Sequence, residues 1–289
     1  MIVTKIIGGL GNQLFQYALG RHLALKNDTQ LYLDLRAFDD YYSLHKYALN
    51  HFNINATPAS DKELKQFIAL TNPWERIRRK FSNLLSPWQF IDENTEKHHA
   101  DILSLTGNIY LDGYWQSEDY FIDVRPMILK ELSLRNTLSP NSIDIYQQIE
   151  VQTCASIHIR RGDYLSNQKT NSVHGLCDLN YYKKAMDKLE NIVEIESYYV
   201  FSDDILWAKE NLKSRKELIF VDHNDASSNF EDLVLMSKCS HHIIANSSFS
   251  WWGAWLNENE QKITVAPKKW FADESKDSSR IIPKNWIKC

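Results

Sequence analysis

Short apolar runs rich in β-branched residues alternate along this chain with segments whose apolar residues recur every three or four positions. Residues 2–7 form the first run, and a glycine-rich turn separates it from a helical pattern over 14–23. Further strands are predicted at 31–35 and 109–115, and Ser117 is placed to cap a helical turn through Tyr120 and Phe121. The first half therefore predicts alternating strands and helices.

The alternation becomes more regular after residue 150. Strands are predicted at 154–160, 198–202, 218–221, 242–245 and 263–266. Helices are predicted at 180–189, 205–212, 229–238 and 248–256. Because a helix between successive strands requires a parallel crossover, the pattern predicts an open parallel sheet covered by helices on both faces.

Residues 138–148 interrupt this rhythm with Pro140 and several polar side chains, and they are the predicted boundary between two halves. We therefore expect an α/β protein of two Rossmann-like domains, residues 1–145 and 146–289, that face each other across a cleft. The sequence shows no internal repeat.

Composition narrows the class of protein. A chain of 289 residues has 43% apolar and 24% charged side chains, as a globular protein does. Its 33 basic and 37 acidic side chains give a net charge of −4, so no global positive field favours nucleic acid. There is no apolar run long enough to cross a bilayer and no evident secretory signal. Four scattered cysteines without a CxxC pair predict reduced thiols in a cytoplasmic protein.

Aromatic residues are frequent, at 12% of the chain with nine tryptophans. Most such rings fill protein cores, and we expect Trp252 and Trp255 there. Aromatic faces also stack on sugar rings and bases. The composition is therefore compatible with a carbohydrate ligand as well.

Residues 72–86 combine an apolar stripe with a basic face. Asn72 and Pro73 are placed to begin a helix, in which residues 74, 77, 81, 84 and 85 share one face and the basic residues 76 and 78–80 another. Two interpretations stay open: a surface helix docked by its stripe, or a basic amphipathic helix that contacts an anionic membrane.

The clearest site motif is His158-Ile159-Arg160-Arg161-Gly162-Asp163, at the end of a predicted strand. Strand alternation puts His158 and Arg160 on one face, and ligands of open α/β sheets bind beyond the carboxyl ends of the strands. Two guanidiniums there suit a diphosphate, because their planar forks pair with phosphate oxygens. Asp163 could hold one guanidinium, and a solvated basic turn paired with Asp163 is the alternative.

A serine-rich turn follows the predicted strand at 242–245 and opens a helix. Its residues are Asn246, Ser247, Ser248, Phe249 and Ser250. Free N–H groups, hydroxyls and the positive end of the helix dipole bind phosphate readily. Simple capping of the helix is the alternative.

Two carboxylates, Asp203 and Asp204, follow the predicted strand at 198–202. They could accept hydrogen bonds from a ribose or a guanine edge, and either could cap the helix at 205–212. Adjacent carboxylates can also bind a metal ion. The arginines at 160 and 161 would neutralise the same phosphate charge, so arginine is preferred over metal.

The turn after the first strand reads Gly8-Gly9-Leu10-Gly11-Asn12-Gln13 and departs from the dinucleotide fingerprint G-x-G-x-x-G. Gly9 lets the backbone approach a ligand closely, and Asn12 and Gln13 could hydrogen-bond sugar hydroxyls or phosphates. A tight structural turn explains the same glycines.

Together these motifs resemble the bacterial α-1,2-fucosyltransferases of glycosyltransferase family 11. The resemblance covers nearly the whole chain in family order. It rests on the blocks at 8–17, 113–118, 158–164, 201–204 and 246–253, and on the tail with Ile281, Ile282, Pro283 and Trp286. It implies a GT-B type fold and inverting transfer of L-fucose from GDP-β-L-fucose to the 2-hydroxyl of a galactose, without metal or cofactor. The implied acceptor is a glycan of O-antigen or another surface polysaccharide, which can be carried on a lipid at the inner face of the plasma membrane.

The resemblance also implies roles on the donor side. Arg160 would bind the β-phosphate and offset the charge that develops on the leaving GDP, with Arg161 and Asp163 in support. His158 and one of the aspartates at 203 and 204 would contact the guanosine. The serines at 248 and 250 would donate to phosphate.

A general base for the acceptor hydroxyl must approach from the face opposite GDP, which points to the N-terminal half. Glu118, Asp119 and Asp34 are the candidates, and a weak base or a water could also serve. Three other interpretations stay open. They are a Rossmann oxidoreductase, a non-catalytic sugar-binding protein and a fucosyltransferase of another linkage, against which the block at 8–17 argues by resemblance.

Overall fold

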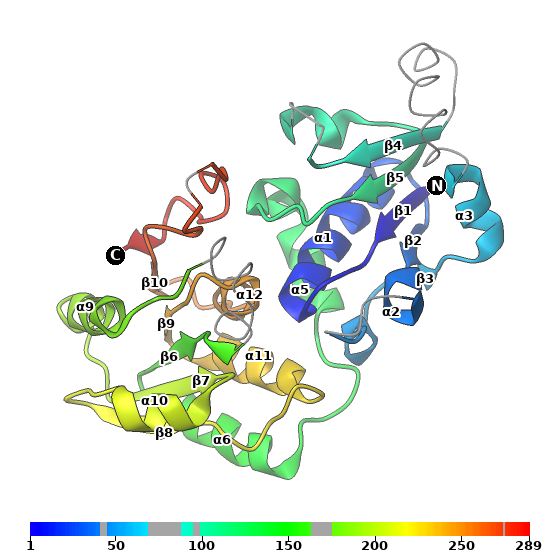
Figure 1. Ribbon diagram of the computed structural model, residues 1–289. Coiled ribbons are helices and arrows are strands. Elements are labelled where there is room, and N and C mark those ends of the chain that lie inside the picture. Colours follow the sequence, from blue (N-terminus) through cyan, green and yellow to red (C-terminus); the bar gives the residue numbers. More distant parts are fainter. Residues whose placement is uncertain (41–44, 69–87, 95–98, 163–174, 274) are drawn as a thin grey trace. The chain divides into compact units, whose positions relative to one another are not determined.

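The computed structural model describes the chain except residues 41–44, 69–87, 95–98, 163–174 and 274. The chain divides into two compact units, Met1–Arg135 and Asn136–Cys289. Each unit has its own parallel sheet with helices (Figure 1). The predicted α/β class is thus confirmed, and the units divide after residue 135, where the sequence predicts a boundary after residue 145.

The first unit contains a five-stranded sheet in the order β3-β2-β1-β5-β4. Every pair of neighbours is parallel. The strands are β1 Ile2–Lys5, β2 Leu31–Asp34, β3 Thr57–Pro58, β4 Trp88–Asp92 and β5 Asn108–Asp112. The chain moves outward from β1 to β2 and β3 and returns on the other side, so the strand order reverses between β1 and β5.

Helix α1, Leu10–Lys26, packs against this sheet and is buried around almost its whole circumference. Gly20 allows the contact, because a Cβ there would lie 2.2 Å from the hydroxyl oxygen of Thr4 on β1. A buried ion pair joins α1 to α5, with 2.9 Å between Arg21 Nη2 and Glu131 Oε1. The other helices of the unit are α2 Arg36–Asp40, η1 Leu49–His51, α3 Asp61–Ile68, η2 His99–Ser104, η3 Glu118–Tyr120, η4 Ile122–Val124 and α5 Arg125–Glu131.

The second unit contains a six-stranded sheet in the order β11-β10-β9-β6-β7-β8. Its neighbours are again parallel throughout. The strands are β6 Cys154–Ile159, β7 Ser197–Ser202, β8 Glu217–Phe220, β9 His241–Ile243, β10 Thr264–Ala266 and β11 Ile287–Lys288. The order reverses between β6 and β9. The sequence missed β3, β4 and β11, which are short or lie on the outer side of the sheets.

Helices of the second unit are α6 Pro140–Glu150, α9 Leu179–Glu190, α10 Ile205–Asn211, α11 Asn229–Lys238 and α12 Ser248–Trp255. Right-handed crossovers place α9 and α10 on one face of the sheet and α11 and α12 on the other. The tryptophans of α12 are buried, and Trp251 and Trp255 stack with ring centroids 6.0 Å apart. The core positions expected for Trp252 and Trp255 are confirmed.

One element differs from the prediction. Residues 138–148, the predicted boundary between the two halves, fall largely in the helix α6. Ser139 caps this helix by accepting a hydrogen bond from the Ser142 N–H, and Pro140 occupies a first-turn position that needs no N–H donor. Proline and polar residues here begin a helix and do not interrupt one.

The basic amphipathic segment at 72–86 lies entirely outside the described residues. Each helix in the described ranges is too short or too polar to cross a membrane.

Candidate functional site

The strand order of the second unit reverses at β6 and β9, and the loops after these two strands carry the two strongest sequence motifs. In open α/β sheets, such a reversal leaves a crevice beyond the carboxyl ends of the strands where ligands bind. Arg160 and Arg161 follow β6, and residues 246–250 follow β9. The topology therefore gathers these motifs at one point.

Asp203, at the end of β7, holds the loop that follows β6. Its carboxylate accepts hydrogen bonds from the backbone N–H of Arg161 at 2.8 Å and of Gly162 at 3.0 Å. The same carboxylate lies 3.1 Å from Arg160 Nη1. Both side chains keep 23% of their surface exposed, so Arg160 is oriented but still accessible. Asp163, the partner expected from the sequence, lies outside the described residues.

Arg161 contacts other residues than Arg160 does. Its guanidinium carbon lies 3.6 Å above the centroid of the Trp207 ring, and its Nε lies 3.4 Å from Asp204 Oδ2. Asp204 also accepts a hydrogen bond from the Trp207 N–H and so caps α10, as the capping interpretation predicts. Sequence reasoning missed Trp207. These contacts make Arg161 part of the support of the loop.

His158 is buried on β6, and its ring lies 5.6 Å from that of Phe249 on α12. Burial, with a contribution from the charge of Arg160, lowers the pKa of His158 to about 3. The imidazole is therefore neutral at physiological pH. Among the described residues, its buried Nδ1 finds no hydrogen-bond partner, which leaves this atom available to a ligand.

The start of α12 is only partly available for binding. The amide of Asn246 donates to the backbone oxygens of Gly175 and Trp270, and the Ser250 hydroxyl donates to the oxygen of Ser247. Ser247 precedes the helix without capping it through its side chain, and Ser248 is half-buried. The first-turn N–H groups of a helix have no partner within the helix, so Ser248 and the backbone beside it suit an anion best.

Asp232 on α11 is a residue that sequence reasoning missed. Helices α11 and α12 both run from the carboxyl edge of the sheet to its amino edge, and a Cβ on Gly253 would lie 3.0 Å from the Met236 side chain. One turn earlier, Asp232 and Phe249 are therefore level with each other. Burial, with the nearby charge of Glu231, raises the pKa of Asp232 to about 7 against a hydrogen bond from Asn224. This shift depends on burial and packing in the fold, so no sequence motif marks Asp232.

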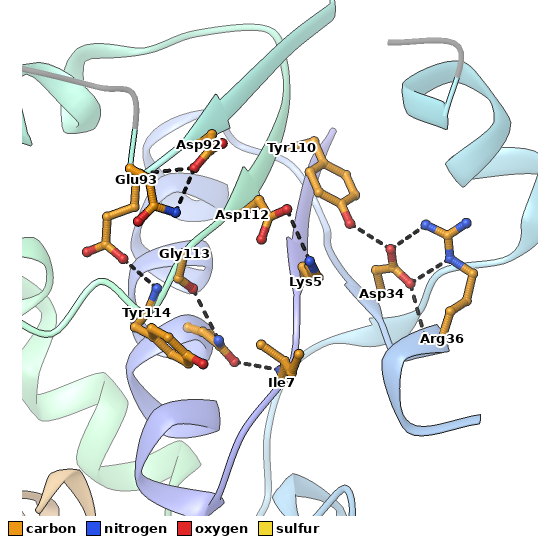
Figure 2. A network of polar contacts seen from close by, with 12 residues as sticks. Lys5, Ile7, Asp34, Arg36, Asp92, Glu93, Tyr110, Asp112, Gly113 and Tyr114 are labelled. Atoms are coloured by element: carbon orange, nitrogen blue, oxygen red, sulfur yellow. Dashed lines mark hydrogen bonds and ion pairs between the residues drawn. The ribbon is translucent and has the colours of Figure 1, made fainter. Parts of the chain in front are cut away.

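In the first unit, the strand order reverses at β1 and β5, and amide side chains tie the two loops there together (Figure 2). Gln16 accepts from the Ile7 N–H at 3.0 Å and donates to the Gly113 oxygen at 3.1 Å. Gln116 donates to Asn12 Oδ1 at 2.8 Å.

Gln13 is fully buried, and its amide bonds the backbone of Gly8, Lys46 and Ala48. Gly8 has φ +90°, which favours glycine, and Gly9 precedes α1 with extended backbone. Gln13 and Gly8 thus build the turn.

The candidate bases have different surroundings. Glu118 is half-buried and Asp119 is exposed on η3, which Ser117 caps as predicted. Asp34 is buried, and Figure 2 shows it between Arg36 and Tyr110. Burial raises its pKa, but hydrogen bonds from Arg36 and Tyr110 outweigh burial and lower it below the usual value. With its lone pairs engaged in this way, Asp34 is poorly placed to accept a proton from a substrate hydroxyl.

Metal binding finds no obvious donor set. Across the ranges that the structure describes, no three side chains of His, Cys, Asp or Glu gather into a group that could hold an ion. Asp203 and Asp204 are already engaged by arginines and backbone N–H groups. Metal independence stays a prediction.

The sequence is similar to proteins of known activity. The model of glycosyl transferase family 11 matches residues 1–289. An alpha-1,2-colitosyltransferase of Escherichia coli is 35% identical over 293 residues, which cover 100% of this chain and 98% of that protein. The O-antigen biosynthesis glycosyltransferase WbnK of Escherichia coli is 33% identical and covers 97% of each chain. The galactoside 2-alpha-L-fucosyltransferase Sec1 of Mus musculus is 24% identical over 89% of this chain and 64% of its own.

Solved structures show the same fold at low sequence identity. NodZ alpha-1,6-fucosyltransferase soaked with GDP-fucose aligns with a TM-score of 0.53 and 14% identity, over 88% of this chain and 91% of its own. The GT-B type of α/β fold expected from the sequence is thus supported by the structural comparison and by the two parallel sheets.

Proposed function

The chain belongs to glycosyltransferase family 11, and from this premise we propose that it transfers L-fucose from GDP-β-L-fucose to the 2-hydroxyl of a galactose, with inversion. The observation that carries the proposal is Arg160, held by Asp203 at the reversal of the second sheet while part of its guanidinium stays exposed. A fixed, accessible cation at this point suits a departing diphosphate.

Arg160 acts on the leaving group. Inverting transfer at C1 passes through an oxocarbenium-like transition state, in which negative charge builds on GDP. A cation already oriented at that charge stabilises the transition state by a few kcal/mol, because it does not reorganise during the reaction. Asp203 positions Arg160, and the half-buried Ser248 and the first N–H groups of α12 bind the phosphates beside it.

Guanosine recognition falls to neutral and acidic groups. His158 presents the buried Nδ1, and Asp232 lies level with Phe249, which contacts the His158 ring. A guanine edge offers N1–H and a 2-amino group, which together satisfy one carboxylate. Asp203 is already occupied by two backbone N–H groups and Arg160. We therefore assign the guanine edge to Asp232 and keep Asp203 for positioning.

The general base is assigned to Glu118 or Asp119, which keep exposed surface in the first unit. Gly9 and Asn12 follow β1 at the reversal of the same sheet, and they complete the set of residues expected to face sugar or phosphate. In a dissociative reaction, a water that accepts the proton late can take the place of a protein base.

Colitose is a second candidate for the transferred sugar. A relative of 35% identity is an alpha-1,2-colitosyltransferase, and colitose is fucose without its 3-hydroxyl group. The two donors share the GDP carrier and the linkage. The contacts that recognise GDP therefore serve both, and only a group facing the 3-hydroxyl separates them.

The test incubates the purified protein with GDP-fucose or GDP-colitose, each with a panel of β-galactosides, and locates the new linkage by NMR. We expect an α-1,2 product from GDP-fucose, formed equally well with EDTA. Exclusive use of GDP-colitose would move the donor to the second candidate. Release of GDP with no glycosidic product from either donor would reject the transfer reaction.

The cellular setting follows from the acceptor. We propose that the protein acts in the cytoplasm on O-antigen repeat units carried by a lipid, because the relative WbnK is an O-antigen biosynthesis glycosyltransferase. Residues 72–86 would then contact the anionic membrane. Sedimentation with liposomes of anionic lipid at low salt tests this contact, and failure to sediment rejects it.

A further inference from the structure

The reversal of strand order in the first sheet carries an exposed aromatic ring. Tyr114 follows the end of β5 and has 44% of its surface exposed. Tyr110, on β5 itself, has only 5% exposed and stacks on Phe90 at 5.0 Å. Leaving a large ring in water forgoes the gain from burying it. Tyr114 is therefore not a core residue, although the next residue, Trp115, is fully buried.

The backbone that presents this ring is fixed by Glu93, which follows β4. Its carboxylate accepts a hydrogen bond from the N–H of Tyr114 at 2.6 Å (Figure 2). It accepts a second one from the N–H of Trp115 at 3.0 Å. A Cβ on Gly113 would lie 2.5 Å from the Glu93 Cβ, so the turn can pack only with glycine there. Trp115 has φ +57°, an unusual value for a side chain of this size. The ring is thus held in a specified position.

A charged pair lies at the same edge of the sheet. Lys5 Nζ is 3.1 Å from Asp112 Oδ2, and 25% and 32% of the two side chains remain exposed. Asp112 precedes Tyr114 by two residues, and Figure 2 shows both side chains at this end of β5. An ammonium and a carboxylate with exposed surface can donate to and accept from hydroxyl groups.

A pyranose matches this combination. One face of a galactose ring is a patch of C–H groups that stacks on an aromatic face, and its edge carries hydroxyls that bind charged groups. A protein partner usually requires a contiguous apolar patch, whereas here one exposed ring and one ion pair lie at the same edge of the sheet. The site also lies where open α/β sheets bind ligands.

We propose that Tyr114, presented by Glu93, is the stacking platform for the galactose of the acceptor, with Lys5 and Asp112 binding its hydroxyl edge. This inference rests on the proposed function, since it names the acceptor subsite of the same reaction. Tyr114 contacts substrate. Glu93 is a positioning residue that acts through the turn.

The experiment compares Tyr114→Ala with Tyr114→Phe, which keeps the ring, and with Leu25→Ala, a residue 40% exposed at the opposite end of α1. We expect Tyr114→Ala to raise the acceptor KM by about tenfold, near the upper end for one aromatic contact. Tyr114→Phe and Leu25→Ala should stay within about twofold of wild type. An unchanged acceptor KM in a folded Tyr114→Ala protein would overturn the platform.

Glu93→Gln tests the positioning role. The amide has one oxygen for two backbone donors, so we expect the acceptor KM to rise while GDP affinity and the hydrolysis of GDP-fucose without acceptor stay unchanged. A merely structural role would lower all of these together, and that result would overturn the assignment.

Wild-type transfer separates this inference from the proposed function. If the wild-type protein forms no glycosidic product, the reaction itself is wrong. Saturation-transfer NMR with methyl β-galactoside then still tests the subsite. Binding that Tyr114→Ala abolishes and Leu25→Ala preserves would support the platform, and binding indifferent to Tyr114 would reject it.

Discussion

In each of the two sheets of this protein, a carboxylate holds the backbone of the loop after a neighbouring strand, but the side chains on the two loops differ in charge. In the second unit, Asp203 after β7 accepts two consecutive backbone N–H groups from the loop after β6. In the first unit, Glu93 after β4 accepts two consecutive N–H groups from the turn after β5. Each carboxylate directly follows one strand and holds the loop that follows the neighbouring strand of the same sheet.

What the two carboxylates present is different. The second unit offers the Arg160 cation and the start of α12, which suit an anion. The first unit offers the Tyr114 ring and, at the same edge of the sheet, the Lys5–Asp112 pair, which together carry no net charge and suit a neutral sugar. The topology therefore decides where a ligand binds, and the few side chains at that point decide which ligand it is.

The largest expected effect comes from removing the cation of the second unit. Arg160→Ala should lower the transfer rate by at least about a hundredfold, roughly 3 kcal/mol of transition-state stabilisation, because it removes the full positive charge that is oriented at the departing GDP. Initial rates measure the effect, and circular dichroism checks the fold. Arg215→Ala, another arginine of this unit, serves as the matched control. Near-normal turnover of Arg160→Ala would remove the basis of the donor site.

A smaller effect is expected from the carboxylate that positions this cation. Asp203→Asn keeps the shape but replaces one acceptor oxygen with a donor, so Arg160 and the loop lose part of their support. We expect about a tenfold to thirtyfold loss, expressed mainly in kcat. Glu93→Gln in the first unit should instead act on the acceptor KM. If both variants changed the same kinetic constant, the two carboxylates would not serve separate ligands.

The smallest effect is a pH dependence that belongs to the second unit alone. With its pKa at about 7, Asp232 gains charge between pH 6 and 8, and the ionised form accepts the guanine N–H groups. GDP should therefore bind about tenfold more tightly at pH 8 than at pH 6. His158, with a pKa of about 3, stays neutral throughout this range.

Calorimetric titration of wild type and Asp232→Asn isolates this contribution, since the titration of GDP itself is common to both proteins. Equal pH dependence in the two proteins would contradict the assignment. The raised pKa of Asp232 also makes the free energy of unfolding depend on pH. The unfolded state loses this proton at lower pH than the folded state, so Asp232 makes the ligand-free protein less stable as the pH rises from about 4 to 7.

Sequence periodicity predicted most central strands and the helices between them, because a buried parallel strand is a continuous apolar run and its helices repeat every three to four residues. It failed for β3 and β11, which are two residues long and carry no period. It also missed the helix α6, because Ser139 and Pro140, which begin this helix, were interpreted as part of the boundary between the two halves.

The sequence alone locates the motifs at 158–162 and 246–250, because residues directly after predicted strands lie at the carboxyl edge of a parallel sheet. What these residues do could not be derived in the same way. Strand alternation and the family resemblance separate Arg160 from Arg161, but neither identifies the contacts of Arg161 with the Trp207 ring and the Asp204 carboxylate.

The amino-acid sequence by itself determined the class of fold and the family resemblance, and it located the proposed ligand sites at the carboxyl edges of the two sheets. Only the tertiary structure showed how the side chains there are held: Asp203 contacts Arg160, Asp232 reaches the level of Phe249, and Glu93 holds the turn before Trp115. The reason is physical. Local periodicity depends on neighbours along the chain, whereas hydrogen-bond partners and desolvation depend on register and packing between strands far apart in the sequence.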